Sequence, residues 1–448
     1  MFYGLRVGMK IERIQMSSGE SYSILFGKDG MPLPYQNLFV TFNYRNYSVA
    51  SETSYAAFEH LRFLEEICEF LKIDLIERCK AGDFLDKKDF ENLRKCSKFK
   101  VESFREQVAK QQSINVVQFN PERNKLETAR AIFVKDEDGD ISPHTAYNRL
   151  TTFAQYIGWL EEQLFPSKES NAEFELKKMR PAKFGTSDEH LDWGEWSSLS
   201  KAEVIRVLDV VRPDSDENPW KSESVKYRNQ LIVNMYDGLG CRRGELLKIR
   251  VKTNDHKSDI RKRADNGTYV ALIRSEVDKG DKRKVRPEGK TLGRYVPMDS
   301  RLGEMYENYL IYHRPNATGS EYIEYLFVTH NNKTKQNNAL SLSQVNKIFR
   351  DISKVVGFRV HPHAHRHAWN DRFSDNANKR IAEKKTTEAK SESDRQKLQG
   401  WSENSKMAQH YSKRHEDKRA MDAGLELQEK HSSEIESIVG QYDQDIPF

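Results

Sequence analysis

The chain has 448 residues, of which 37% are hydrophobic and 31% are charged, and its formal net charge is +5. This length is too great for one ordinary hydrophobic core and predicts two or three domains, while the apolar content excludes wholesale disorder. The four cysteines are too sparse for a disulfide framework and lack zinc-type spacing, which indicates reduced thiols. The sequence contains no run of 18 apolar residues, so no membrane helix is predicted. We therefore expect a soluble, cytoplasmic protein without a membrane partner.

The first 45 residues carry short alternating or aromatic runs at 22–26 and 38–42, separated by the turn-forming residues 27–30. Such runs on either side of a glycine-containing turn are typical of a hairpin or a small three-stranded piece. We predict a β-rich N-terminal arm over residues 1–45. It is either an accessory binding arm or a strand pair that packs on the next domain.

Apolar residues recur at helical spacing from Ser51 onward, and Ser51 is a candidate N-cap. A second helical pattern follows Asp86, also a candidate N-cap, and continues to about residue 111. The pair Ser142-Pro143 is typical of an N-cap and first turn and opens a further helix. We predict an all-helical domain over residues 46–165, a pattern that indicates no function by itself.

Residues 166–196 lose the helical period and gather prolines, a glycine and many charges, which predicts a linker. Beyond the linker we expect a second domain over residues 197–415 and a C-terminal helix or tail over 416–448. Its expected elements are a helix that begins near Ser200, an apolar helix at 225–250, paired strands at 269–273 and 294–298, and helices at 302–313 and 343–357. The predicted fold class is mainly α with a small β-sheet (α+β).

The segment 238–249 interrupts an apolar helix with glycines and two arginines, Arg242 and Arg243, followed by Glu245. Glycines let the backbone turn and approach a ligand closely. On one interpretation an arginine and Glu245 form a surface ion pair that adds little stability. On the other, an arginine is held for bidentate contact with a phosphate, and Glu245 fixes the local geometry. The spacing favours neither interpretation.

Residues 278–294 form a basic connection between the two predicted strands. A charge run of this kind is usually a solvated loop, but a basic loop between strands is also suited to a nucleic-acid groove. Its cationic side chains are Lys279, Lys282, Arg283, Lys284, Arg286, Lys290 and Arg294.

Four histidines and an arginine are concentrated in residues 361–367. In an extended chain alternate residues share one face, so the histidines would line up as metal ligands. If a helix begins near Pro362 instead, His363 and Arg366 share a face and can grip one anion. A metal site would need further ligands downstream, and the positive charge of Arg366 would repel the cation. The four histidines are His361, His363, His365 and His367.

Trp401 follows a glycine and is separated by ten positions from Tyr411, which lies among basic residues. A single tyrosine in a helix usually packs in a core or on a surface. A tyrosine flanked by histidine, lysine and arginine is less suited to a core, and its hydroxyl can serve as a covalent nucleophile.

Taken in chain order, five motifs resemble the tyrosine recombinase (phage integrase) family. The resemblance spans about residues 46–414 and implies a helical core-binding domain followed by a catalytic domain, which together form a C-shaped clamp around double-stranded DNA. The motifs are Arg-x-Gly-Glu-Leu at 242–246, a lysine in a strand-to-strand loop, Pro-His-x-x-Arg-His at 362–367, Gly-Trp at 400–401, and Tyr411.

The resemblance implies, motif by motif, an anion-binding site made of Arg242, His363 and Arg366, with Glu245 in a supporting role. Trp401 stands where the family has His or Trp and supplies an indole N–H donor. The implied nucleophile is Tyr411.

The resemblance also implies a lysine that acts as general acid. Lys279 matches the family's Lys-Gly position, and Lys290 is the alternative. The remaining cations of the loop that we expect to contact DNA are Lys282, Arg283, Lys284 and Arg294, together with Lys290.

The implied reaction is attack of Tyr411 on a DNA phosphodiester, which gives a 3′-phosphotyrosine that a 5′-hydroxyl can reverse. It needs no metal and no cofactor. Members of the family act as homo-tetramers on two duplexes, assembled from free monomers or dimers, and their C-terminal tail packs on a neighbouring protomer. In this chain, residues 416–448 pack either on a neighbouring protomer or on their own domain. We therefore expect a site-specific recombinase or integrase that integrates or excises a mobile element in the bacterial cytosol.

Two other functions remain open at this point. A metal-dependent hydrolase would use the histidine cluster at 361–367. A catalytically decayed DNA-binding protein would explain the ten-residue separation of Trp401 and Tyr411, which is one residue longer than the family pattern.

Overall fold

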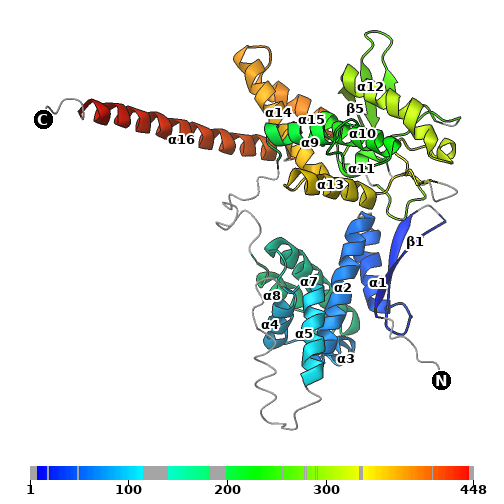
Figure 1. Cartoon of the computed structure of the whole chain (residues 1–448). Helices are drawn as coiled ribbons and strands as arrows, with labels where there is room; N and C mark the ends of the chain where they lie inside the picture. The colour runs from blue at the N-terminus through cyan, green and yellow to red at the C-terminus, as the bar shows by residue number, and fades with distance from the viewer. Residues whose placement is uncertain are drawn as a thin grey trace. The chain divides into compact units, whose positions relative to one another are not determined.

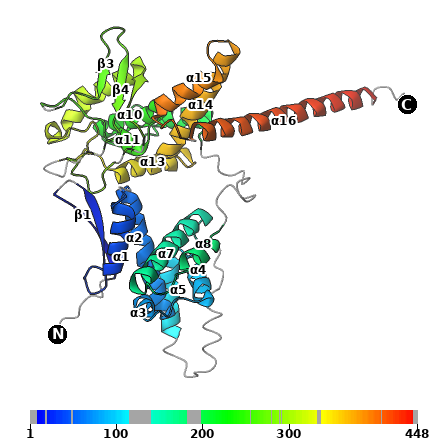
Figure 2. The same cartoon turned by 180° about the vertical axis from the view of Figure 1, so that it is seen from behind.

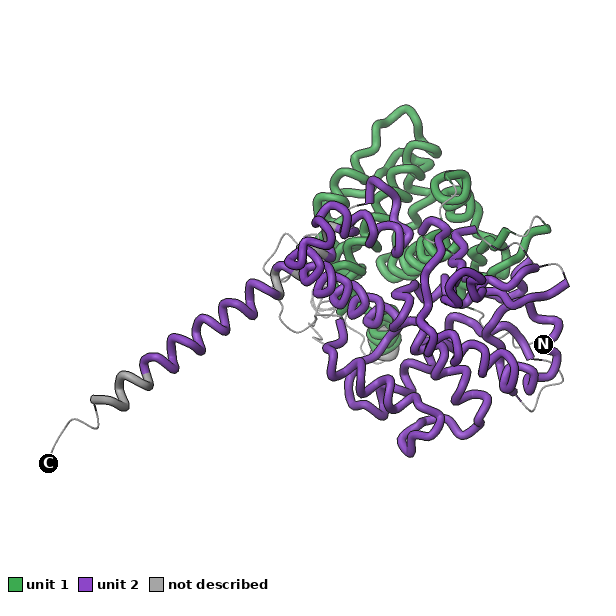
Figure 3. Tube along the Cα trace, turned by 90° about the horizontal axis from the view of Figure 1, so that it is seen from above, with its two compact units in different colours: residues 1–194 green, residues 195–448 purple. Residues whose placement is uncertain are grey.

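The computed structural model divides the chain into two compact units, residues 1–194 and 195–448 (Figure 3). The residues that the structure describes are 8–17, 20–47, 50–114, 140–181, 198–254, 256–276, 278, 280–287, 289, 291–331, 337–405 and 407–442. Every helix among these residues is too short or too polar to span a lipid bilayer.

The first unit begins with an antiparallel hairpin of β1 (Lys10–Gln15) and β2 (Ser21–Phe26). The prediction of a strand at 38–42 is wrong, because this stretch belongs to the helix α1 (Pro34–Val40) and the π-helical turn η1 (Thr41–Arg45). Phe39 and Val40 are adjacent and both buried, which a helix packed on a core allows and a one-sided strand does not. The three-stranded alternative therefore does not hold.

The other elements in the described part of the first unit are helices. Ser142 caps α7 (Pro143–Leu164), which together with the long helix α2 (Ser51–Leu71) supplies most of the core. Phe58, Leu64, Phe153 and Ile157 are fully buried in it. Figure 1 shows these helices side by side. The helices are α2 (Ser51–Leu71), α3 (Leu75–Lys80), α4 (Lys87–Cys96), α5 (Val101–Ile114), α7 (Pro143–Leu164) and α8 (Ala172–Lys178).

Two boundaries in this unit differ from the prediction. The pattern expected to run unbroken from Asp86 is split between α4 and α5, and the carbonyls of Ser97 and Phe99 at the break accept hydrogen bonds from the buried Nη1 of Arg149, at 2.7 and 2.8 Å. The predicted linker at 166–196 contains α8, which packs on α7 through buried apolar side chains. Periodicity missed the break because it depends on Arg149, about 50 positions away, and missed α8 because a helix of seven residues is too short to show a clear period.

The second unit is built around α10 (Glu223–Leu239), which packs against α12 (Ser300–Asn308), α14 (Pro362–Ala382) and β5 (Arg294–Met298) (Figures 1 and 2). A three-stranded antiparallel sheet in the order β3-β4-β5 lies beside it, and the predicted pairing of 269–273 with 294–298 is confirmed. The short β3 was not predicted. The strands and flanking helices are α9 (Lys201–Val210), α11 (Arg243–Leu246), β3 (Ile260–Lys262), β4 (Tyr269–Ile273), β5 (Arg294–Met298), α12 (Ser300–Asn308), η3 (Tyr309–His313), η4 (Arg314–Asn316), η5 (Ser320–Tyr322) and α13 (Leu342–Val356).

Three helices complete the second unit: α14 (Pro362–Ala382), α15 (Glu388–Gln399) and α16 (Met407–Tyr442). The first turn of α16 packs on α14 and α15, and the rest of the helix projects away from the other elements of the second unit (Figures 1 and 2). Met421, Leu425, Leu427 and Ile435 are exposed on it. Packing of this tail on its own domain therefore does not hold for these residues.

The mainly α fold with small antiparallel sheets agrees with the predicted fold class.

Candidate active site

Arg242 lies in a tight turn at the end of α10. The helix ends at Gly240, whose backbone is left-handed (φ 59°) and whose missing side chain leaves room for Trp369, because a Cβ there would lie 2.7 Å from the indole. Arg242 then acts as N-cap of α11, and its N–H donates to Oε2 of Glu245 at 2.9 Å. The neighbouring Arg243 points elsewhere and bonds Asn346 of α13. Of the two arginines in this turn, Arg242 therefore lies at the candidate site and Arg243 does not.

Glu245 is a fully buried carboxylate that fixes this turn. It accepts hydrogen bonds from Nη2 of Arg294 at 2.8 Å and from the hydroxyl of Thr291, in addition to the Arg242 N–H. Burial alone would raise the pKa of Glu245, but the charge and hydrogen bonds of these partners outweigh burial and lower the pKa to about 2. Glu245 therefore remains an acceptor and supports Arg242 without taking part in proton transfer.

We expect the ionised Glu245, with Arg294, Thr291 and the Arg242 N–H together as its partners, to contribute about 3 kcal/mol of stability at neutral pH, because its pKa falls from 4.5 to about 2 on folding. A depressed carboxyl pKa stabilises the fold above the unfolded value, and this contribution disappears as the pH falls from about 4.5 through 2. Urea denaturation at several pH values should thus show Glu245→Gln less stable than wild type at pH 7, with the difference shrinking in acid.

A matched control is Glu217→Gln, which removes an exposed carboxylate paired with Arg206 and should change stability little at any pH. An undiminished gap between Glu245→Gln and wild type at pH 3 would contradict the assignment of the buried charge.

Arg366 is the central cation of the site. Its side chain is 1% exposed, and Nη1 donates to the carbonyl of Gly240 at 2.7 Å. Among the described residues, neither Nε nor Nη2 has a hydrogen-bond partner. Burial and then the charge of Arg242 lower the pKa of Arg366 to about 10. A buried guanidinium with two unused donors beside a second arginine is an arrangement suited to an oxyanion such as a phosphate.

A chain of rings leads from His363 to Trp401. The His363 ring centre lies 4.3 Å from that of His367, and His367 lies 5.4 Å from Tyr411. Trp401 stacks on Tyr411 at 5.5 Å with an angle of 10°, and the Arg366 guanidinium carbon is 5.7 Å from the Trp401 ring centre. The indole N–H of Trp401 is buried and has no acceptor among the described residues. The structure therefore brings together four residues that the sequence predicts for the site: His363, Arg366, Trp401 and Tyr411.

His367 is a site residue that the sequence analysis did not predict. It lies one helical turn after His363 on α14, and this i, i+4 spacing is the signal that could have found it. Because its ring lies between those of His363 and Tyr411, it helps to set the position of the tyrosine. His365 points away from the site, toward Asp237 at 3.5 Å and the ring of Phe349.

The helical interpretation of the histidine cluster is confirmed, and the extended one is wrong. His361 is the N-cap of α14, and its side chain accepts the Ala364 N–H. The helix sends His363 and His367 toward Tyr411 and His365 toward Asp237, so the four imidazoles do not share one face. In the described part of the chain, no three side chains of His, Cys, Asp or Glu form a metal-binding group.

The basic loop contains both exposed and buried cations. Lys282 and Lys284 are exposed, whereas Lys279 and Lys290 lie outside the described residues. Arg283 is buried against the Asp281 carboxylate, and Arg294 is buried against Glu245 and the Leu398 carbonyl. The prediction that Arg283 and Arg294 contact DNA therefore needs correction, because their donors are engaged inside the unit.

Comparison with known proteins agrees with this geometry. Residues 198–384 match the phage integrase family, in a segment that contains Arg242, Glu245, His363, Arg366 and His367. Over these residues the second unit is therefore similar to the phage integrase (tyrosine recombinase) family.

A solved structure described as the crystal structure of XerA recombinase is similar over 84% of this chain and 92% of its own, with 16% sequence identity and a TM-score of 0.33. That score is too low for a detailed comparison. No curated protein matches the chain.

Proposed function

We propose that the chain is a site-specific recombinase that integrates or excises a mobile element and cleaves DNA through a 3′-phosphotyrosine intermediate. The observation that carries this proposal is the buried guanidinium of Arg366, with its unused donors, in the same cluster as Arg242, Trp401 and Tyr411. A phosphodiester is the anion that this group of donors would bind when the nucleophile is a tyrosine.

In the proposed reaction the hydroxyl oxygen of Tyr411 attacks the phosphorus and the bond to the 5′-oxygen breaks. Negative charge develops on the non-bridging oxygens during this step. Arg242, Arg366 and the indole N–H of Trp401 stabilise it, and His363 adds a further donor from the exposed end of the ring chain. These donors are held in place before the substrate arrives, which is the condition under which such stabilisation is large.

The leaving 5′-oxygen needs a proton, and Lys279 is the proposed general acid, with Lys290 as the alternative. Both lysines belong to the connection between β4 and β5. Lys282 and Lys284, which are exposed on the same connection, are the proposed DNA contacts.

The proposed active assembly is a homo-tetramer on two duplexes. The exposed apolar side chains of α16 support this assembly, because Met421, Leu425, Leu427 and Ile435 find no cover in their own unit. On the proposed assembly they pack on a neighbouring protomer.

The proposal is tested with a nicked duplex that traps the covalent intermediate. The duplex is first selected from a randomised library for binding to the full chain, and a nick beside the candidate cleavage position lets the short product diffuse away. We expect a covalent protein–DNA band in EDTA. Absence of the band on the bound duplex, or its appearance only with added zinc or manganese, would contradict metal-independent tyrosine chemistry.

A further inference from the structure

Arg294, the first residue of β5, is a buried arginine whose three side-chain nitrogens bond three different segments of the second unit. Its side chain is 5% exposed. Nη2 donates to Oε2 of Glu245 at 2.8 Å, Nη1 to the hydroxyl of Thr291 at 3.0 Å, and Nε to the carbonyl of Leu398 at 2.7 Å. Glu245 belongs to α11 and Leu398 to α15, which lie 49 and 104 positions away in the chain. One guanidinium therefore joins β5 to both helices.

The first attachment leads from Arg294 to Arg242. The Glu245 oxygen that accepts from Arg294 also accepts the backbone N–H of Arg242 at 2.9 Å, and Nη1 of Arg242 lies 3.5 Å from the other oxygen. The Glu245 side chain is fully buried and ionised, because its pKa is lowered to about 2. A buried carboxylate that loses its cationic partner is left with an uncompensated charge. The position of Arg242 therefore depends on Arg294 through Glu245.

The second attachment leads from Arg294 to Trp401. Leu398 lies in the last turn of α15, and Gly400 ends this helix in a left-handed conformation with a φ of 65°. A Cβ at Gly400 would lie 2.6 Å from the Leu292 carbonyl and 2.8 Å from Nη1 of Arg294, so glycine lets the helix end approach the arginine closely. The Gly400 carbonyl also accepts the Leu292 N–H at 2.8 Å. Trp401 is the next residue, and the position of its indole N–H therefore depends on the same arginine.

We propose that Arg294 is a positioning residue that holds the Arg242 guanidinium and the Trp401 indole N–H at matched positions around one anion. This inference rests on the proposed function, in which both groups stabilise charge on the non-bridging oxygens. Each nitrogen of Arg294 is bonded inside the unit, so the arginine acts through these two residues and not on the phosphate. Groups that stabilise a transition state need to be held within about 0.5 Å of their working positions. A displacement of about 1 Å costs about 100-fold in rate.

The test compares Arg294→Lys with wild type on two nicked duplexes, one with the natural phosphodiester and one with a neutral methylphosphonate at the scissile position. Lysine keeps a positive charge beside Glu245, but its single nitrogen cannot occupy the places of three guanidinium nitrogens. We expect covalent product to form about 10- to 100-fold more slowly on the phosphodiester. The gap should narrow on the methylphosphonate, because that duplex lacks the charge that Arg242 and Trp401 are proposed to stabilise. A substitution that only loosens the fold would slow both duplexes alike.

A second readout needs no DNA. The chain is labelled with 5-fluorotryptophan, and the fluorine NMR resonance of Trp401 is identified by its absence in Trp401→Phe. We expect this resonance to shift in Arg294→Lys, because the end of α15 loses its bond from Nε of Arg294 to the Leu398 carbonyl. The resonance of Trp159, which lies on α7 in the first unit, should stay in place. The shift reports the link from Arg294 to the indole independently of any reaction.

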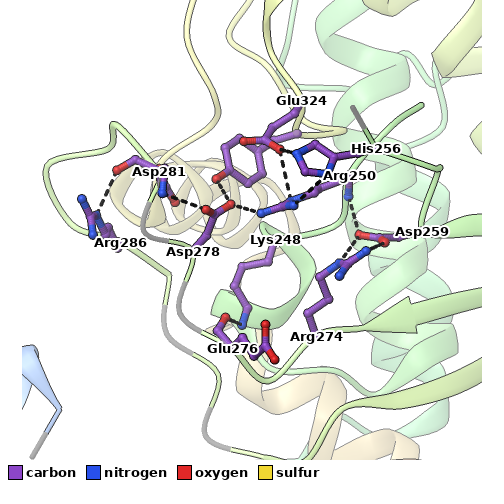
Figure 4. A network of polar contacts seen from close by, with 12 residues as sticks. Lys248, Arg250, His256, Asp259, Arg274, Glu276, Asp278, Asp281, Arg286 and Glu324 are labelled. Atoms are coloured by element: carbon purple, nitrogen blue, oxygen red, sulfur yellow. Dashed lines mark hydrogen bonds and ion pairs between the residues drawn. The ribbon is translucent and has the colours of Figure 1, made fainter. Parts of the chain in front are cut away.

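Arg274→Lys is the matched control. Arg274 follows β4 and donates from Nη2 to the buried carboxylate of Asp259 at 2.7 Å, as Figure 4 shows. The control thus alters the same kind of pair outside the attachments to α11 and α15. It should cleave both duplexes like wild type and leave the Trp401 resonance unchanged.

If circular dichroism shows that Arg294→Lys does not fold, Thr291→Val decides the question. It removes the hydroxyl that donates to Glu245 and accepts from Nη1 of Arg294, and leaves the arginine in the chain. The same difference between the two duplexes is expected, with a smaller slowing.

Equal slowing of both duplexes, no slowing of either, or an unmoved Trp401 resonance in Arg294→Lys would overturn the positioning role and leave the proposed function standing. If the wild-type chain forms no covalent product with the phosphodiester duplex, the proposed function itself fails. The two failures are thereby distinguished.

Discussion

The variant Tyr411→Phe is expected to bind DNA like wild type and to form no covalent product. Phenylalanine keeps the stacking on Trp401 and the contact with His367, so the site should retain its shape while losing its nucleophile. We expect cleavage to fall by about 10⁴-fold or more, which is the scale of losing a nucleophile in other enzymes. The nicked-duplex assay measures the chemistry, and a gel-shift measurement on the same duplex measures binding.

Tyr442→Phe is the matched control, because Tyr442 is the other tyrosine of α16. It should form covalent product at the wild-type rate. Product formation by Tyr411→Phe, or its loss in Tyr442→Phe alone, would move the nucleophile away from the ring cluster.

The variant Arg366→Lys is expected to slow cleavage by about 10²- to 10³-fold, the cost of losing one preorganised donor. Lysine keeps the positive charge but lacks the planar fork that bonds the Gly240 carbonyl and presents two further N–H groups. Arg366→Ala should be slower still, because it also removes the charge. Rates of covalent product formation at saturating protein measure the effect without a contribution from binding.

A duplex with a neutral methylphosphonate at the scissile position distinguishes charge stabilisation from loss of structure. Replacing a non-bridging oxygen by methyl removes the charge that Arg366 is proposed to stabilise, so the gap between Arg366→Ala and wild type should narrow on this duplex. Arg372→Lys is the control, since Arg372 lies on the same helix but bonds Asp237 outside the ring cluster. An unchanged gap on the neutral duplex would assign Arg366 a structural role alone.

Local rules predicted the parts of the structure that depend on near neighbours. Ser142, Ser200 and Asp86 cap their helices as expected, and the i, i+3 spacing of His363 and Arg366 placed both in one helical site. The order of the five motifs along the chain predicted which residues belong to the candidate active site, although no single motif would have been enough for that prediction.

Two features that the sequence did not predict depend on distant partners. A run of basic residues looks alike whether an arginine faces solvent or a buried acid, so the pairing of Arg294 with Glu245, 49 positions earlier, was hidden. The same holds for Arg283, whose acceptors include the Leu340 carbonyl. At residues 38–42 the apolar pattern fits a strand or a helix, and Pro34 at the first turn of α1 was the overlooked signal.

The most direct test of the central claim is to identify the residue that carries the DNA. The covalent product from the nicked duplex is digested with nuclease and trypsin, and the modified peptide is identified by mass spectrometry. The account predicts a nucleotide joined through its 3′-phosphate to Tyr411. A nucleotide on another residue, or a 5′-linked adduct, would contradict it.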